Sequence, residues 1–204
     1  MTNTPEDCYA LLEPVVGPLH ENFTAAYHAA RKLGYPPVRE PGWFRTAAFK
    51  RMLADFLPEQ LGSFTFARDL ATTNPRLLLT DDDNGLQISV RRSTGLRKSM
   101  RGRRQVAPVG LFPRSDLSIP RPKVEKAALA WDWPETDDDG ELTGPWPLGF
   151  LLAKPGRSLD EGDWEFGLPL IQGATLTEYL DAFNPIDEPL TFLDSDDEDG
   201  AAAQ

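Results

Sequence analysis

The spacing of apolar residues changes near residue 60, from intervals of three and four to intervals of two, and this change constrains the fold most. The longer intervals place side chains on one face of a helix, and the shorter ones place them on one face of a strand. An N-terminal helical part followed by a sheet predicts the α+β class. The helical stripes comprise Leu19, Phe23, Ala26, Tyr27 and Ala30, and then Phe44, Ala48, Met52 and Phe56.

Prolines are expected to divide the helical part. The pair Thr4-Pro5 supplies a capping residue and a suitable first helical residue, so a helix is predicted to begin there. Pro14 and Pro18 each lack a backbone donor, and we expect them to end this helix. A second helix is then predicted over residues 18–33 and a third over residues 43–57.

Turn sequences mark the strands. Asn84-Gly85 favours a tight hairpin turn, and apolar residues alternate with polar ones around it, over residues 76–90. A second hairpin is predicted over residues 127–153, around an acidic turn at 136–140, and a further extended stretch over 164–171. These segments predict a small antiparallel sheet of hairpins, with the N-terminal helical layer packed on it.

The length of the chain suits one compact domain. We predict a single α+β domain over residues 1–189, with helices within 5–57 and a hairpin-rich sheet within 63–171. Residues 93–123 are rich in proline and basic residues and show little periodicity, so they are predicted to form a mobile basic linker. Residues 190–204 are predicted to form a disordered acidic tail.

The composition excludes several classes of protein. With 40% apolar residues, 11 Phe and 5 Trp, the chain can bury a core. Its single cysteine, Cys8, excludes a disulfide framework and a cysteine-rich zinc site. No apolar run reaches the length of a membrane span and the N-terminus is polar and acidic, so we expect a cytoplasmic protein without membrane contact.

Charge is separated along the chain. The net charge is −11, yet residues 84–131 carry 11 basic and 2 acidic side chains, whereas residues 132–204 carry 2 basic and 19 acidic ones. Blocks of like charge favour recognition through electrostatics. Separated patches of opposite sign also allow head-to-tail self-association.

The basic residues concentrate in residues 91–104, which we call the cationic segment. Arginine pairs bidentately with carboxylate or phosphate, so the segment is predicted to bind an acidic protein or a nucleic acid, unless it only balances local acids. Aromatic residues, which would stack on single-stranded nucleic acid, are missing from it. Its basic residues are Arg91, Arg92, Arg97, Lys98, Arg101, Arg103 and Arg104.

The predicted tail contains an acidic run at residues 194–199. It is interpreted either as a solubilising tail or as a docking element, which could compete for the cationic segment within the chain or in a second copy. Its acidic residues are Asp194, Asp196, Asp197, Glu198 and Asp199.

Trp131 and Trp133 are expected to share one face of a strand. Core filling is the ordinary role of such residues, and an exposed aromatic platform for a partner is the alternative.

Catalytic motifs are missing from the sequence. Glycine-rich phosphate loops and the H-E-x-x-H pattern do not occur, and no cofactor or metal is expected. His20 and His28 are about 12 Å apart along a predicted helix and cannot share a metal there. Asp83, Glu125 and Asp132 are the carboxylates that a metal-dependent nuclease would need.

The sequence therefore favours a non-enzymatic interaction protein. We expect a regulatory or antagonist protein of a bacterial or phage-type system, of the toxin–antitoxin or defence kind, that binds a protein partner through its separated charges. A nucleic-acid-binding protein that uses the cationic segment is the first alternative. A metal-dependent nuclease is the second.

Overall fold

The computed structural model describes residues 4–32, 42–71, 75–94, 124–157, 159, 164–173 and 191–192. The described part has two helices, α1 (Pro5–Lys32) and α2 (Gly42–Phe56), and one mixed sheet, so the α+β class is confirmed. The strands are β1 (Gln60–Leu61), β2 (Phe64–Asp69), β3 (Arg76–Asp81), β4 (Leu86–Thr94), β5 (Glu125–Trp131), β6 (Leu148–Ala153), β7 (Trp164–Pro169) and β8 (Thr191–Phe192).

α1 starts where the sequence predicts. The hydroxyl of Thr4 accepts the amide of Asp7 at 3.2 Å, and the Asp7 carboxylate accepts the amide of Thr4 at 3.0 Å. Each side chain thus satisfies a backbone donor that the first helical turn leaves without a partner.

The break predicted at Pro14 and Pro18 is wrong, because α1 continues through both prolines to Lys32. Both prolines are exposed, so the carbonyl groups that lose a backbone donor can be hydrated. The opposite face of α1 is buried in the core, and this packing outweighs the cost of the missing hydrogen bonds.

The sheet is larger than predicted and is not purely antiparallel. Its strands follow the order β1-β2-β3-β4-β5-β6-β7, and β8 pairs with the end of β4. The expected hairpins are present as β3–β4 and β5–β6, and β7 is the third extended stretch. However, β4 and β5 lie side by side in parallel, with Leu86 opposite Glu125 and Arg92 opposite Trp131.

Residues 93–123, the predicted basic linker, begin within β4 and lead from β4 to its parallel neighbour β5. Ser93 and Thr94 belong to β4, where they pair with Phe192 and Thr191 of β8. The remainder of the predicted linker lies outside the described residues, and it joins two parallel neighbours. Likewise, the tail was predicted to begin at residue 190, but Thr191 and Phe192 belong to the sheet.

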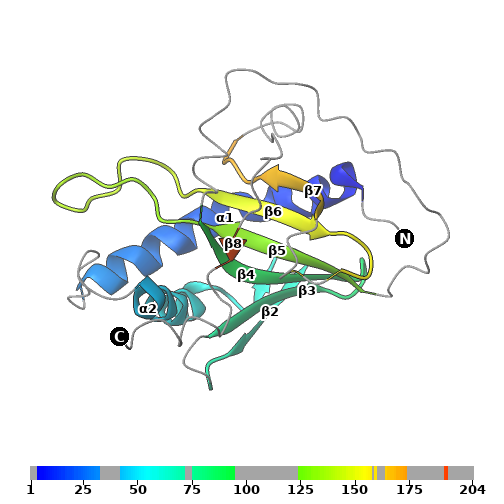
Figure 1. The fold of residues 1–204 in the computed structure, drawn as a ribbon, viewed down its shortest axis with the longest axis horizontal. Coiled ribbons are helices and arrows are strands. Elements are labelled where there is room, and N and C mark those ends of the chain that lie inside the picture. The colour runs from blue at the N-terminus through cyan, green and yellow to red at the C-terminus, as the bar shows by residue number, and fades with distance from the viewer. Residues whose placement is uncertain are drawn as a thin grey trace, which may run out of the picture.

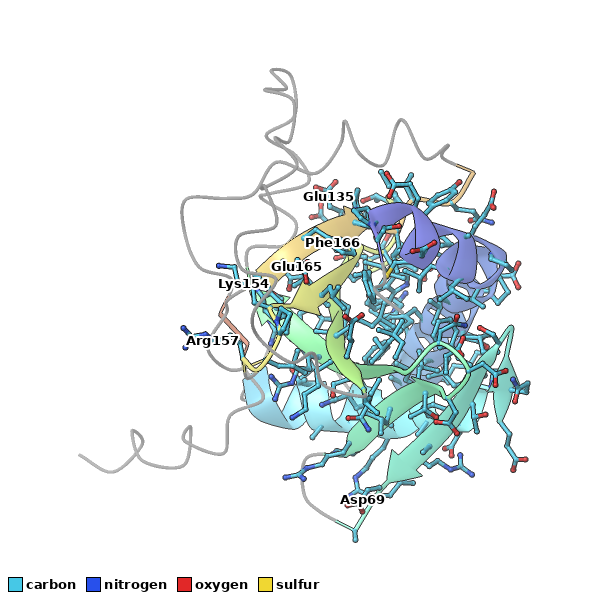
Figure 2. All side chains as sticks on the ribbon, turned by 90° about the vertical axis from the view of Figure 1, so that its right-hand side faces the viewer. Asp69, Glu135, Lys154, Arg157, Glu165 and Phe166 are labelled. Carbon is cyan, nitrogen blue, oxygen red and sulfur yellow. The ribbon has the colours of Figure 1, made fainter. Side chains whose placement is uncertain are left out.

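The sheet has two distinct faces. Ile88, Leu129 and Phe150 lie on the face that packs against α1 and α2, which we call the helix face. Figure 1 shows α1 behind the sheet, and Figure 2 views the sheet from its side with α1 to the right. Because side chains alternate along a strand, Ala128 and Leu151 lie on the opposite face, which we call the open face.

Neither helix in the described part of the chain combines the length and the apolar character that crossing a membrane requires.

Candidate functional site

The candidate site lies where β4 and β5 end. Parallel strands finish at the same edge of a sheet, and here Arg92 of β4 is the neighbour of Trp131 of β5. We call this the carboxyl edge. The cationic segment continues from β4 at this edge, and the acidic turn of residues 137–141 follows β5. The topology therefore brings two oppositely charged parts of the chain to one end of the sheet.

Arg92 is anchored inside the fold. Its side chain is 12% exposed, and its Nη1 donates to the hydroxyl of Thr46 on α2 at 3.2 Å. Its Nε lies 3.7 Å from a carboxylate oxygen of Asp132, and its Cζ lies 5.8 Å from the centre of the Trp133 ring. Arg92 thus connects α2 to the carboxyl edge.

A second arginine, Arg45, lies over the same indole ring. The Cζ of Arg45, on α2, lies 4.4 Å from the centre of Trp133, which is within the range of a cation–π contact. Burial, and then the like charge of Arg92, lower the pKa of the Arg45 guanidinium from its usual value. Two guanidinium groups therefore meet at one ring, and Asp132 supplies a carboxylate to one of them.

Aromatic residues fill the core beneath these arginines. The ring of Phe49 stacks on Trp146 with centroids 5.2 Å apart, and Trp131 lies 4.9 Å from Phe49. Trp131 and Trp146 are buried, whereas Trp133 is half-buried at the edge of the cluster. Trp131 therefore has the core-filling role, and of the two platform residues only Trp133 keeps exposed surface.

The described residues contain only the start of the cationic segment. Arg91 and Arg92 alternate along β4, so Arg92 faces the helices and Arg91 faces the open side. Arg97, Lys98, Arg101, Arg103 and Arg104 lie outside the described residues. The same holds for Asp194, Asp196, Asp197, Glu198 and Asp199 of the acidic run.

The acidic turn is held against the end of α1. Arg31 donates to the Glu141 carboxylate at 2.5 Å and to the Asp139 carbonyl at 2.6 Å. The hydroxyl of Tyr27 donates to the carbonyl of Gly140 at 2.8 Å. Asp138 remains exposed, as do the other acids of the turn. The contacts with Arg31 and Tyr27 thus hold the acidic turn against α1.

The three carboxylates considered for a nuclease do not converge. Asp83 lies in the β3–β4 turn, and Glu125 begins β5 at that same edge, where its amide donates to the Gly85 carbonyl. Asp132 follows the other end of β5, about 20 Å away for a strand of this length. Within the described ranges, no three His, Cys, Asp or Glu side chains lie close enough to hold a metal ion.

The other reactive side chains serve the core. His20 is buried, and its Nε2 lies 2.8 Å from the carbonyl of Leu170, so this nitrogen carries the proton and donates it. Cys8 is buried, and burial, with the negative charges of Glu125 and Asp7, raises the pKa of its thiol to about 12. That thiol is therefore protonated at neutral pH.

Sequence reasoning missed Arg45 and Thr46 as parts of the site. The spacing of four between Arg45 and Phe49 places both on one side of α2, and this was the available signal. The approach of α2 to the carboxyl edge depends on tertiary packing, which the spacing does not show.

The chain matches no protein-family model, no curated protein and no solved structure.

Proposed function

We propose that this chain is a non-enzymatic interaction protein that binds an acidic surface of another protein through its cationic segment. We further propose that the acidic run competes with the partner for the same arginines. A protein that switches its own binding in this way fits the regulatory or antagonist role expected from the sequence.

The pairing of β4 with β8 carries this proposal. Thr191 and Phe192 lie antiparallel to Thr94 and Ser93. The cationic segment continues directly beyond Thr94, and the acidic run begins shortly after Phe192. Because the pair is antiparallel, the chain beyond Phe192 heads toward Arg92 and Arg91, at the start of the cationic segment, and not toward the residues beyond Thr94. This direction supports a raised effective concentration of the acidic run at the start of the cationic segment.

The carboxyl edge supports recognition through charge. Arg45 and Arg92 both lie beside the ring of Trp133, and a carboxylate oxygen of Asp132 lies 3.7 Å from the Nε of Arg92. Arginine and tryptophan are the residue types that contribute most at protein interfaces. The exposed acids of residues 137–139 beside this site would disfavour nucleic acid, whose phosphates they repel.

Charge reversal tests the binding role. The variant R97E/R101E/R104E is compared with a control, K32E/R51E/R76E, which changes net charge equally at exposed positions on other elements. Polyglutamate and a duplex DNA of random sequence are the two probes, titrated at low and at physiological salt. We expect polyglutamate to bind the native chain and the control but not the cationic variant.

Two results would reject this function. If neither probe binds the native chain at low salt, the cationic segment is not a binding element. If the DNA binds more tightly than polyglutamate and its affinity falls steeply with salt, the nucleic-acid alternative replaces the proposal.

Truncation tests the competition. Removing residues 193–204 takes away the acidic run but keeps β8, and we expect it to tighten polyglutamate binding by about tenfold, the effect of about 1.4 kcal/mol. A control in which Asp194, Asp196, Asp197, Glu198 and Asp199 become Asn or Gln keeps the length and should bind equally tightly. Unchanged affinity in both variants would remove the competing role of the run.

A further inference from the structure

The turn between β3 and β4 contains a residue pair that can modify itself, Asn84-Gly85. Glycine has no Cβ to shield its backbone nitrogen, so this nitrogen can attack the side-chain carbonyl carbon of a preceding asparagine. Asparagine is for this reason among the chemically labile residues. Of the asparagines in the sequence, only Asn84 precedes a glycine. The others precede a bulkier residue or a proline, which has no N–H: Asn3, Asn22, Asn74 and Asn184.

The folded turn holds the Asn84 side chain against Asp81. The side-chain amide of Asn84 donates to Oδ2 of Asp81 at 3.0 Å, and its backbone amide donates to Oδ1 at 3.0 Å. Asp81 is buried, and the hydroxyl of Ser63 donates to its Oδ2 at 2.6 Å. Hydrogen bonds to a carboxylate are stronger than those between neutral groups. Asn84 is therefore held at two atoms by a carboxylate that is itself anchored.

Gly85 is fixed by its backbone. Its φ is +62°, a conformation that glycine adopts without strain. Its carbonyl accepts the amide of Glu125 at 2.7 Å, which connects the turn to the start of β5. Closing a ring through Asn84 and Gly85 requires the side-chain amide of Asn84 to leave Asp81. The reaction is therefore expected to proceed from the opened turn.

We propose that Asn84 is a site of spontaneous deamidation and that the Asp81 carboxylate restrains the reaction in the folded chain. The Gly85 nitrogen bonds to Cγ of Asn84, the bond between Cγ and Nδ2 breaks, and ammonia leaves with the proton of the Gly85 nitrogen. A water molecule then opens the resulting succinimide. Opening at Cγ gives aspartate, and opening at the backbone carbonyl carbon gives isoaspartate. The reaction consumes water, releases ammonia and involves no oxidation. The inference does not depend on partner binding.

Either product weakens the turn that contains it. Aspartate replaces the Nδ2 donor by a carboxylate oxygen at a contact of 3.0 Å with Asp81, where two like charges repel each other. Isoaspartate routes the chain through Cβ and so lengthens the backbone just before Gly85. The carbonyl of Gly85 holds Glu125, and the β4–β5 ladder begins with Leu86 opposite Glu125. The modification therefore acts on the first link between the two parallel strands.

Peptide mapping measures the reaction. Trypsin cleaves after Arg76 and Arg91 and releases residues 77–91, in which Asn84 is the only asparagine. Liquid chromatography with mass spectrometry separates the asparagine, aspartate and isoaspartate forms after incubation at mildly alkaline pH. The folded chain is compared with the chain in concentrated urea. We expect Asn84 to be lost at least about tenfold more slowly in the folded chain, the effect of about 1.4 kcal/mol.

Variants of the turn test the restraint. Folded D81A should lose Asn84 at least about tenfold faster than the folded native chain, because both hydrogen bonds to the carboxylate are gone. In urea the two should react at similar rates. D82A removes a charge at an exposed position of the same turn and should match the native chain in both conditions. S63A keeps the carboxylate but removes its anchor, and it should accelerate the loss by a smaller factor.

The outcomes separate the two parts of the proposal. If Asn84 persists in urea, the pair is not reactive and the proposal is overturned. If the native chain reacts at one rate in both conditions, or folded D81A reacts like folded D82A, Asp81 does not restrain the reaction. If D81A does not fold, S63A decides, and a rate equal to that of the native chain overturns the restraint.

The variant N84D contains the aspartate product from the start. In N84D the amide of Glu125 should exchange with solvent faster than in N84S, which removes the side-chain amide without adding charge. Equal exchange in the two variants would overturn the proposed effect of the aspartate product on the β4–β5 ladder.

Discussion

The guanidinium of Arg45 lies over the ring of Trp133, with 4.4 Å between Cζ and the ring centre, and the two residues come from α2 and from the loop after β5. Removing this charge in R45M should lower the free energy of unfolding by about 1 kcal/mol, because a partly desolvated cation–π contact is worth about that much. Urea denaturation followed by tryptophan fluorescence measures the change. K32M, at an exposed position of α1, should unfold like the native chain.

The contact between Tyr27 and Gly140 is expected to fix the acidic turn. Y27F removes the hydroxyl that donates to the Gly140 carbonyl at 2.8 Å, and it should lower the free energy of unfolding by about 1 kcal/mol. Hydrogen exchange at residues 137–141 should accelerate in Y27F. In Y9F the lost hydroxyl bonds to an exposed carboxylate at 3.3 Å, so exchange in the turn should stay unchanged. Equal exchange in both variants would mean that Tyr27 does not hold the turn.

Asp81 is expected to organise the β3–β4 hairpin. Its carboxylate accepts the Ser63 hydroxyl at 2.6 Å and the Asn84 amide at 3.0 Å. Burial alone would raise the pKa of Asp81, but these hydrogen bonds more than offset it and the pKa is lowered. D81A should lower the free energy of unfolding at neutral pH by about 2 kcal/mol, whereas D82A, in the same turn and exposed, should change it by less than about 0.5 kcal/mol.

Acid should weaken this same hairpin. A carboxyl group with a lowered folded pKa stabilises the protein above its unfolded pKa of about 3.9, and this contribution is lost as the pH falls through the folded value. The difference in stability between the native chain and D81A should therefore narrow on acidification below about pH 4. A difference that is constant between neutral and acidic pH would show that the charge of Asp81 contributes nothing.

His20 should make the fold sensitive to milder acid. Burial, opposed by the hydrogen bond to Leu170, lowers the pKa of His20 from 6.5. The unfolded chain then binds a proton more readily than the folded chain, so stability falls as the pH drops below about 6.5, by at most about 1.4 kcal/mol per pH unit. Melting temperatures at about pH 7.5 and 5.5 measure this loss. H20Q, whose amide can donate to Leu170, should lose less stability on acidification than H28Q.

Local signals in the sequence predicted most of the elements. The Asn84-Gly85 turn and the alternation around it define the β3–β4 hairpin, and the acidic turn lies within the β5–β6 connection, as expected. These features depend on residues that are near each other in the chain. The continuity of α1 through Pro14 could not be predicted, because it depends on which side of the helix the core covers.

The parallel pairing of β4 with β5 had no local signal. Hairpin turns in a sequence indicate antiparallel neighbours. The parallel partner of Val90 is Leu129, which lies far along the chain and is connected by no such turn. For the same reason the sequence did not show that the cationic segment and the acidic turn start at one edge. Arg92 was predicted as a binding residue, and its contact with Asp132 became visible only when β4 and β5 were placed together.

The parallel ladder between β4 and β5 also has a consequence for how the chain folds. On each side of it the strands of the main path pair antiparallel through shorter connections, β1 to β4 before residue 95 and β5 to β7 after residue 124. Joining the groups requires closure of the long connection between them, which costs more entropy than closing any of those shorter connections. The parallel ladder thus joins the two antiparallel groups, and its formation is expected to set the folding rate.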